Sequence, residues 1–235
     1  MAKSGSQTPP TNPVTAVIGD LVASRQLSPP DRREVQAELR QFLSWLNQDY
    51  RAAVLSDFVI TTGDEFQALL RDPELIPDLA WELEAKLAHV GVRLGIGFGA
   101  IYTPLRPVAI GMDGPAFHQA REAITKAAKK GWNGGVFLGF SDPGDKILNG
   151  FARVLHRHRS DMTERQREVA VILRQGKTQT EVAEMLEITK QAVSDHVGAM
   201  GWEEYFLAET GWRAALKMLG SADRTTTDDN PDDNQ

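Results

Sequence analysis

The sequence of 235 residues contains no cysteine. Disulfide bonds and thiolate metal sites are therefore excluded, which fits a reducing compartment. Its apolar runs are only as long as a strand, so neither a signal peptide nor a membrane span is expected. These absences predict a soluble cytoplasmic protein that has no membrane partner.

The net charge of the body of the chain is also small. The formal net charge is −6 at pH 7, and residues 221–235 supply −4 of it through five Asp and one Arg. This tail and residues 1–13 are polar, so neither can repay the entropy cost of ordering. The chain length and the 41% hydrophobic content suit two domains. We expect disorder over 1–13, a first domain over 14–150, a second over 151–220, and an acidic disordered tail over 221–235.

Apolar periodicity within the first domain indicates alternating strands and helices. Strands are expected over 14–18, 92–102 and 135–140, a hairpin within 58–69, a short edge strand over 107–111, and helices over 30–50, 73–90, 113–130 and 143–158. The order β-α-β-β-α-β predicts a ferredoxin-like sheet, and hence an α+β fold. Gly95, Gly97 and Gly99 predict that another element lies close over one face of the fourth strand.

The hairpin turn is acidic: it carries Asp64 and Glu65, where an ordinary two-residue turn would use Asn-Gly. In the predicted topology the third strand lies beside the first, so Asp20, just past the first strand, should meet Asp64 at one edge. Carboxylate oxygens suit Mg²⁺ or Mn²⁺, whose coordination substrate phosphates would complete. Asp20, Asp64 and Glu65 are therefore candidate metal ligands, although short carboxylates also cap backbone N–H groups in turns.

Nucleotide phosphates have four candidate ligands in this domain. Ser24 and Arg25 follow the first strand, and Arg121 and Lys129 lie on the 113–130 helix, whose Gly-Pro start suits an anion. Helix capping and a solvated basic helix face are the alternatives. If the domain is catalytic, the candidate catalytic residues are Asp20, Asp64, Glu65 and Arg121.

A second signal lies in the C-terminal domain. Thr163 and Gln166 predict a capping box that opens a helix. The apolar residues that follow have the spacing of two short helices crossed around a small core: Val182, Ala183, Leu186, Ile188, Val193 and Val197. This arrangement predicts a small all-α helix-turn-helix domain whose second helix enters the major groove of DNA.

DNA contacts are expected from both helices of the pair. Lys190, Gln191, Ser194 and His196 would face bases or phosphates, and Lys177 and Thr178 would face the DNA backbone. The alternative is a trihelical module that serves packing or dimerisation. Glu187 stands where such turns usually have Gly, and residues 153–200 hold eight Lys or Arg against seven Asp or Glu, a weak footprint for DNA binding.

Four segments carry a family resemblance: Ile18–Arg25, Thr61–Gln67, Arg93–Gly99 and Ile110–Arg121. Together they resemble the SatD family of bacterial proteins, over roughly residues 14 to 220. The first two segments more distantly resemble the palm of class III nucleotidyl cyclases and diguanylate (GGDEF) cyclases. That resemblance implies a metal pair at Asp20 and Asp64, with Glu65 as auxiliary ligand. The C-terminal helices resemble the helix-turn-helix of LuxR-type regulators and of sigma-factor region four.

The combination predicts a DNA-binding transcriptional regulator, expected as a homodimer, whose cyclase-like palm binds a metal–nucleotide as sensory ligand. An alternative is a Mg²⁺- or Mn²⁺-dependent nucleotidyl cyclase acting on a nucleoside triphosphate. Thr62 stands where the diguanylate enzymes have their first Gly, and His118 roughly where class III cyclases have Asn, so the resemblance favours binding over turnover. A third possibility is a degenerate palm that serves only as a dimerisation scaffold.

Overall fold

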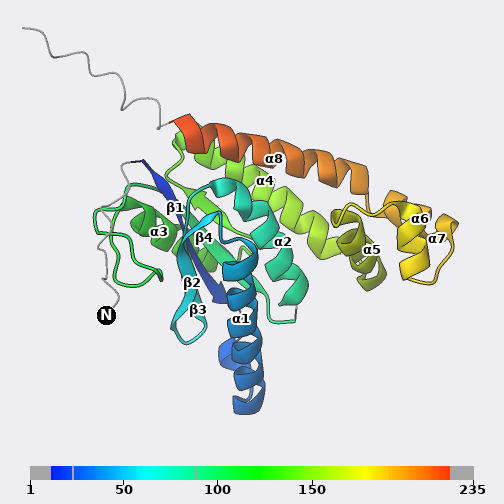
Figure 1. The fold of residues 1–235 in the computed structure, drawn as a ribbon, viewed down its shortest axis with the longest axis horizontal. Helices are drawn as coiled ribbons and strands as arrows, with labels where there is room; N and C mark the ends of the chain where they lie inside the picture. Colours follow the sequence, from blue (N-terminus) through cyan, green and yellow to red (C-terminus); the bar gives the residue numbers. More distant parts are fainter. Residues whose placement is uncertain (1–11, 23, 88, 223–235) are drawn as a thin grey trace, which may run out of the picture. The chain divides into compact units, whose positions relative to one another are not determined.

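The computed structural model describes residues 12–22, 24–87 and 89–222. The described residues form five strands and eight α-helices (Figure 1), so the expected α+β class is confirmed. The elements are β1 (Val14–Leu21), α1 (Pro29–Asp49), β2 (Val54–Thr62), β3 (Glu65–Leu70), α2 (Ile76–Lys86), β4 (Val92–Gly99), α3 (Pro115–Lys130), β5 (Val136–Leu138), α4 (Asp142–Asp161), α5 (Glu164–Arg174), α6 (Gln179–Met185), α7 (Lys190–Ala199) and α8 (Trp202–Ala222).

The chain divides into two compact units. Unit 1 comprises the described residues up to Gly150 together with those from Arg213 onward, and unit 2 comprises Phe151–Trp212. The first domain was also expected to end at residue 150, but residues 213–220, expected in the second domain, belong to unit 1. The predictions of disorder over 1–13 and 221–235 fall almost wholly outside the described residues. Residues 221 and 222, however, are the last of α8.

Unit 1 is built on a single sheet with strand order β2-β3-β1-β4-β5. Strand β1 is antiparallel to both β3 and β4, and β5 is parallel to β4. The β2–β3 hairpin reverses at Gly63 and Asp64, and Gly63 has a φ of 65°, a conformation that glycine adopts without strain. Along the chain the elements follow as β1-α1-β2-β3-α2-β4 before α3 and β5 are added.

Two strand predictions are wrong in detail. Strand β1 continues to Leu21, so Asp20 lies within the strand and not after it. Residues 107–111 form no strand: Val108 makes only an isolated bridge with Asp57. Hydrogen bonds connect this loop to β2. In one of them the hydroxyl of Ser56 in β2 donates to the carbonyl of Arg106 at 2.7 Å.

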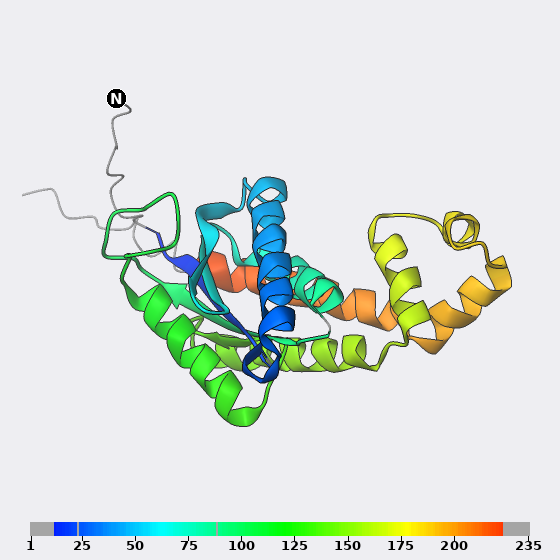
Figure 2. The same cartoon turned by 90° about the horizontal axis from the view of Figure 1, so that it is seen from below.

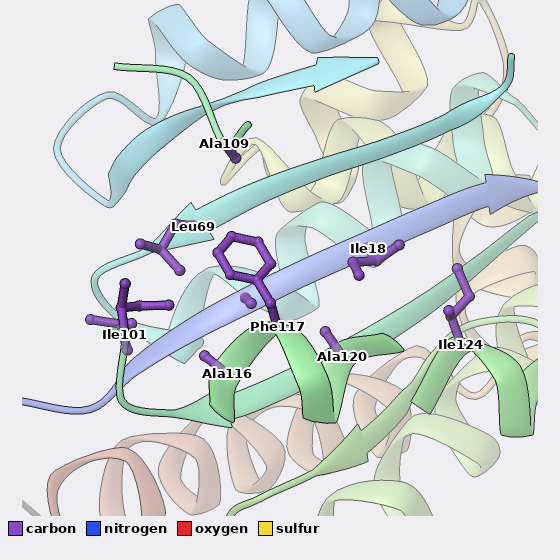
Figure 3. Packing of buried hydrophobic residues seen from close by; sticks show 10 residues of the cluster. Ile18, Leu69, Ile101, Ala109, Ala116, Phe117, Ala120 and Ile124 are labelled. Carbon is purple, nitrogen blue, oxygen red and sulfur yellow. The ribbon is translucent and has the colours of Figure 1, made fainter. Parts of the chain in front are cut away.

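Helix α3 covers one face of the sheet (Figure 2) because glycines in β4 leave room for it. A Cβ atom at Gly97 would overlap the carbonyl oxygen of Ala116 and the backbone nitrogen of Ala120, and one at Gly95 would meet the same helix. The expected close approach over the glycine face is therefore present. Figure 3 shows the side chains of α3, Phe117 among them, packed toward Ile18 of β1.

The opposite face of the sheet carries aromatic packing and α1. The ring of Phe66 occupies the space where a Cβ of Gly19 would stand, and it contacts the ring of Phe58 at 6.5 Å between centroids. The side chain of Asn47 in α1 exchanges two hydrogen bonds with the backbone of Phe58. Helix α1 is capped at its N-terminus by Ser28, whose hydroxyl accepts from the backbone N–H of Asp31.

Unit 2 contains α5, α6 and α7 around a small apolar core in which Val169, Val182 and Val193 are fully buried. The predicted capping box of Thr163 and Gln166 is confirmed at the start of α5. A second capping box opens α6, and Thr189 caps α7. None of the helices that the structure describes has the length and apolar character needed to cross a membrane.

Candidate functional site

Three carboxylates, those of Asp20, Asp64 and Glu65, lie at one end of the strands β1 and β3, and we call this end the acidic edge. Asp20 lies near the end of β1. Its Oδ2 accepts from Nη1 of Arg93 at 3.5 Å, across the β1–β4 ladder in which the two residues are opposite each other. Its Oδ1 is buried and has no hydrogen-bond partner. Buried carboxylate oxygens are normally satisfied, so an unpartnered one calls for an explanation.

The pKa of Asp20 is raised above its ordinary value. Burial of the carboxylate is the main cause, and repulsion from Asp64 and Glu65 adds to it, whereas Arg93 opposes it. The sheet register explains the proximity: Gly19 is opposite Phe66, so Asp20 lies beside Glu65. The topology thus brings together the carboxylates that the sequence predicts to meet.

Asp64, in the hairpin turn, accepts a hydrogen bond from Ser24, which follows β1. The hydroxyl of Ser24, which is 2% exposed, donates to Oδ2 of Asp64. The side-chain amide of Gln36 in α1 donates to the carbonyl of Gly63 at 3.1 Å. Ser24, predicted to bind phosphate, is therefore engaged in positioning a carboxylate.

Glu65, the first residue of β3, is paired with Arg121 of α3. Nη2 of Arg121 donates to Oε1 of Glu65 at 2.7 Å and Nη1 donates to Oε2, so the pairing is bidentate. The Thr61 hydroxyl also donates to Oε1, at 3.1 Å. These hydrogen bonds, with that of Arg121 first, hold the pKa of Glu65 below its ordinary value.

The other predicted ligands of unit 1 do not join this edge. Lys129 is exposed in the last turn of α3, and the side chain of Arg25 is outside the described part of the structure. No three His, Cys, Asp or Glu side chains in the described ranges are grouped closely enough to hold a metal ion. The arrangement thus offers the carboxylates of Asp20 and Asp64, while Arg121 occupies the carboxylate of Glu65.

Two residues of this edge, Arg93 and Thr61, are not among the site residues predicted from the sequence. Arg93 lies opposite Asp20, and Thr61 reaches Glu65 across the hairpin. The quoted segments contain both residues, but only the β1–β4 register and the hairpin geometry indicate their partners. The only signal in the sequence that could have identified them is that both are polar residues within predicted strands that lie next to the acidic residues.

Helix α7 presents the predicted DNA-reading residues on an exposed surface of unit 2. Lys190, Gln191 and Ser194 are exposed, and the amide of Gln191 donates to Oδ1 of Asp195 at 2.8 Å. His196 is half-buried. In the preceding turn Glu187 has a φ of 53°, the left-handed conformation for which Gly is favoured.

The two residues predicted to contact the DNA backbone, which directly precede α6, already have partners. The hydroxyl of Thr178 forms the capping box with Glu181, and Nζ of Lys177 is 3.1 Å from Oε1 of Glu181. The backbone N–H of Thr178, together with these side chains, lowers the pKa of Glu181 to about 2. Glu181 therefore competes with a DNA phosphate for both residues.

These observations define a two-unit α+β protein with an acidic sheet edge in one unit and an exposed capped helix in the other. Its sequence matches the model described as SatD family over residues 14–213. The chain belongs to the SatD family. A search among curated proteins found no match for it.

Replacing Asp20 by Asn is expected to stabilise unit 1 at pH 7. Because the pKa of Asp20 is raised in the folded state, ionisation costs stability above that pKa, and the cost disappears as pH falls below the unfolded value of about 3.9. Asn removes this cost, so the melting temperature should rise at pH 7 and should rise by less toward pH 4. Differential scanning calorimetry from pH 4 to 7 measures the difference. Asp49→Asn, at an exposed site that ends α1, is the control, and a lower melting temperature for Asp20→Asn at pH 7 would contradict the prediction.

Proposed function

We propose that this SatD-family protein is a DNA-binding transcriptional regulator whose unit 1 binds a metal–nucleotide as its signal. The observation that carries the proposal is helix α7, which begins at the Thr189 cap and exposes Lys190, Gln191 and Ser194. Its packing against α6 across the turn at Glu187 is what a helix-turn-helix requires. Exposed Lys and Gln side chains suit phosphates and adenine edges respectively.

For unit 1 we infer a ferredoxin-like palm of the nucleotidyl-cyclase type. The order β2-β3-β1-β4, with β1 antiparallel to both neighbours, supports it. The cyclase-like motifs contribute Asp20 and the Gly63–Asp64 turn to one edge of this sheet. Phosphate binding there is consistent with the guanidinium of Arg121 on the adjacent helix.

We infer Mg²⁺ or Mn²⁺ as the metal of this proposal. Asp20 and Asp64 supply carboxylate oxygens, which hard divalent cations prefer. The buried Oδ1 of Asp20 has no hydrogen-bond partner, and a bound cation would satisfy it. A bound cation would neutralise the phosphates of a nucleotide. Ser24 holds the Asp64 carboxylate in place, and Arg93 orients Asp20.

A signal of this kind requires that the nucleotide bind two states of the protein with different affinity. We propose a homodimer as the DNA-binding form, because paired recognition helices read two half-sites of an operator. The nucleotide would then shift the equilibrium between a dimer that fits the operator and one that does not.

DNA binding is tested with fluorescence anisotropy on genomic fragments at several salt concentrations, with and without Mn²⁺ and each nucleoside triphosphate. Lys190→Ala should weaken binding about 3- to 10-fold and reduce the salt slope by about 1, because one phosphate contact is lost. Gln191→Ala should lose about 1–3 kcal/mol of base discrimination. Lys217→Ala, an exposed lysine of unit 1, is the matched control and should bind as wild type does. The proposal fails if the wild-type protein does not bind DNA, or if both α7 variants bind like the control.

A nucleotidyl cyclase is the second candidate, and the proximity of Asp20 and Asp64 favours it. Two metals held there would position a ribose 3′-hydroxyl to attack the α-phosphate, which releases pyrophosphate. Pyrophosphate release from any nucleoside triphosphate with Mn²⁺, abolished by Asp64→Asn, would support this activity. Its absence with all four nucleotides would leave nucleotide binding as the role of the edge.

A further inference from the structure

A cavity of about 320 Å³ lies in unit 1 between the first half of β2 and the loop that precedes α3. This volume is within the range of sites that bind small molecules. The cavity is at the start of β2, whereas the turn that carries Asp64 follows the end of the same strand. It is therefore a feature separate from the acidic edge.

Hydrogen bonds join the two walls of the cavity. The backbone N–H of Asp57 donates to the carbonyl of Pro107 at 2.8 Å, and the hydroxyl of the fully buried Ser56 donates to the carbonyl of Arg106. Strand β2 also shifts its register between Val54 and Ser56. Such irregularities redirect side chains and are frequent next to functional sites. The cavity is thus fixed by the fold before any ligand binds.

Apolar side chains line part of this cavity. Leu55 of β2 and Leu105 of the loop line it and also pack against the hydrophobic core of unit 1. Val54 and Pro107 line it as well. An apolar group of a ligand would leave water on binding here, which favours association.

Three charged side chains line the same cavity: Arg51, which follows α1, Asp57 of β2, and Arg106 of the loop. In the part of the chain that the structure describes, none of the three forms an ion pair. The guanidinium of Arg106 lies beside Gly111, where an added Cβ would be 3.2 Å from Nη1. Two guanidinium groups around one cavity raise the local concentration of anions, and their planar donors suit a carboxylate.

We propose that this cavity binds a free α-amino acid with an apolar side chain. The carboxylate of the ligand binds Arg51 and Arg106, and its ammonium group binds Asp57. Its side chain packs on Leu55 and Leu105. A phosphate would satisfy the arginines but not the aspartate, and a simple amine would leave two guanidinium groups without a counter-ion. The inference goes beyond the proposed regulator and does not depend on it.

A thermal-shift screen of the full chain with each apolar L-amino acid selects the tightest ligand, because binding to the native state raises the melting temperature. Calorimetry then compares this ligand with its amide, which lacks the carboxylate, and with its deaminated acid, which lacks the ammonium group. For L-leucine these analogues are L-leucinamide and isocaproate. The amino acid should bind about tenfold or more tightly than either analogue, since each analogue lacks one charge-assisted contact.

Two variants separate the two charged contacts. Arg106→Gln should weaken binding of the amino acid about tenfold but leave binding of the amide within about twofold of wild type. Asp57→Asn should weaken the amino acid by about the same factor and leave the deaminated acid unchanged. Arg40→Gln, at an exposed position of α1 that does not line the cavity, is the control and should bind as wild type does.

Circular dichroism melts establish that each variant is folded, and the comparison of analogues on wild type does not require the variants. The proposal is overturned if no apolar amino acid raises the melting temperature, or if inorganic phosphate binds more tightly than the best amino acid. It is also overturned if Arg106→Gln weakens the amino acid and its amide equally. These measurements use neither metal, nucleotide nor DNA, so their failure leaves the proposed regulator standing.

Discussion

Glu209→Ala is expected to lower the free energy of unfolding of unit 2 by about 3–5 kcal/mol, because it breaks a buried ion pair by removing one partner. Glu209 lies on α8 and is 4% exposed. Its Oε2 is 2.6 Å from Nη1 of Arg174 on α5 and accepts from the hydroxyl of Tyr205 at 2.8 Å. The same hydroxyl accepts from Arg159 of α4 at 3.2 Å, so one carboxylate connects three helices.

The cost arises from the charges that remain. Without Glu209, the guanidinium of Arg174 stays largely buried and loses this counter-ion. Burial is also the main reason that the pKa of Tyr205 is raised. This network joins α8 to α5, and α5 packs against α6 and α7. Loss of the carboxylate should therefore lower the stability of the packing around α6 and α7.

Hydrogen exchange measured by mass spectrometry separates unit 2 from unit 1 and is the appropriate readout. Protection should fall in residues 151–212 while the strands of unit 1 keep theirs. Glu184→Ala, at an exposed position of α6, is the control and should change stability by less than about 0.5 kcal/mol. A loss below about 1 kcal/mol for Glu209→Ala would show that the network contributes little.

Gly97→Ala is expected to destabilise unit 1 by about 1–3 kcal/mol, the range typical of overpacking. The added Cβ would overlap backbone atoms of Ala116 and Ala120 in α3, and backbone cannot rotate aside as a side chain would. The helix must therefore shift away from β4. Since Arg121 follows Ala120 on α3, the shift should also weaken its pairing with Glu65.

Chemical denaturation followed by circular dichroism measures the change. Gly150→Ala is the matched control: this glycine lies in α4, and a Cβ there meets no atom within 4 Å. Alanine should then stabilise the helix by about 0.5–1 kcal/mol, an effect of opposite sign from the same chemical substitution. Equal effects at the two positions would contradict the packing argument.

The order of elements and the meeting of Asp20 with the acidic hairpin were predictable from the sequence. Period-two and period-3.6 apolar patterns indicate strands and helices locally, and the rule for crossover connections places the first strand beside the third. The capping box at Thr163 was equally predictable, because it depends on residues three positions apart. The glycines of β4 predicted close contact, though not that α3 makes it.

The hydrogen-bond partners of individual side chains could be identified only in the folded structure. Nothing local shows that Ser24 binds Asp64, that Arg93 faces Asp20, or that Glu65 turns to Arg121, since each pair is 40 or more residues apart. Nor does periodicity show that the end of α8 belongs with unit 1. Backbone topology follows from patterns within short windows, whereas rotamers and ion pairs depend on which distant segments pack together. The acidic edge was thus visible in the sequence, but the pairing of Asp20 with Arg93, of Asp64 with Ser24 and of Glu65 with Arg121 is a property of the packed fold.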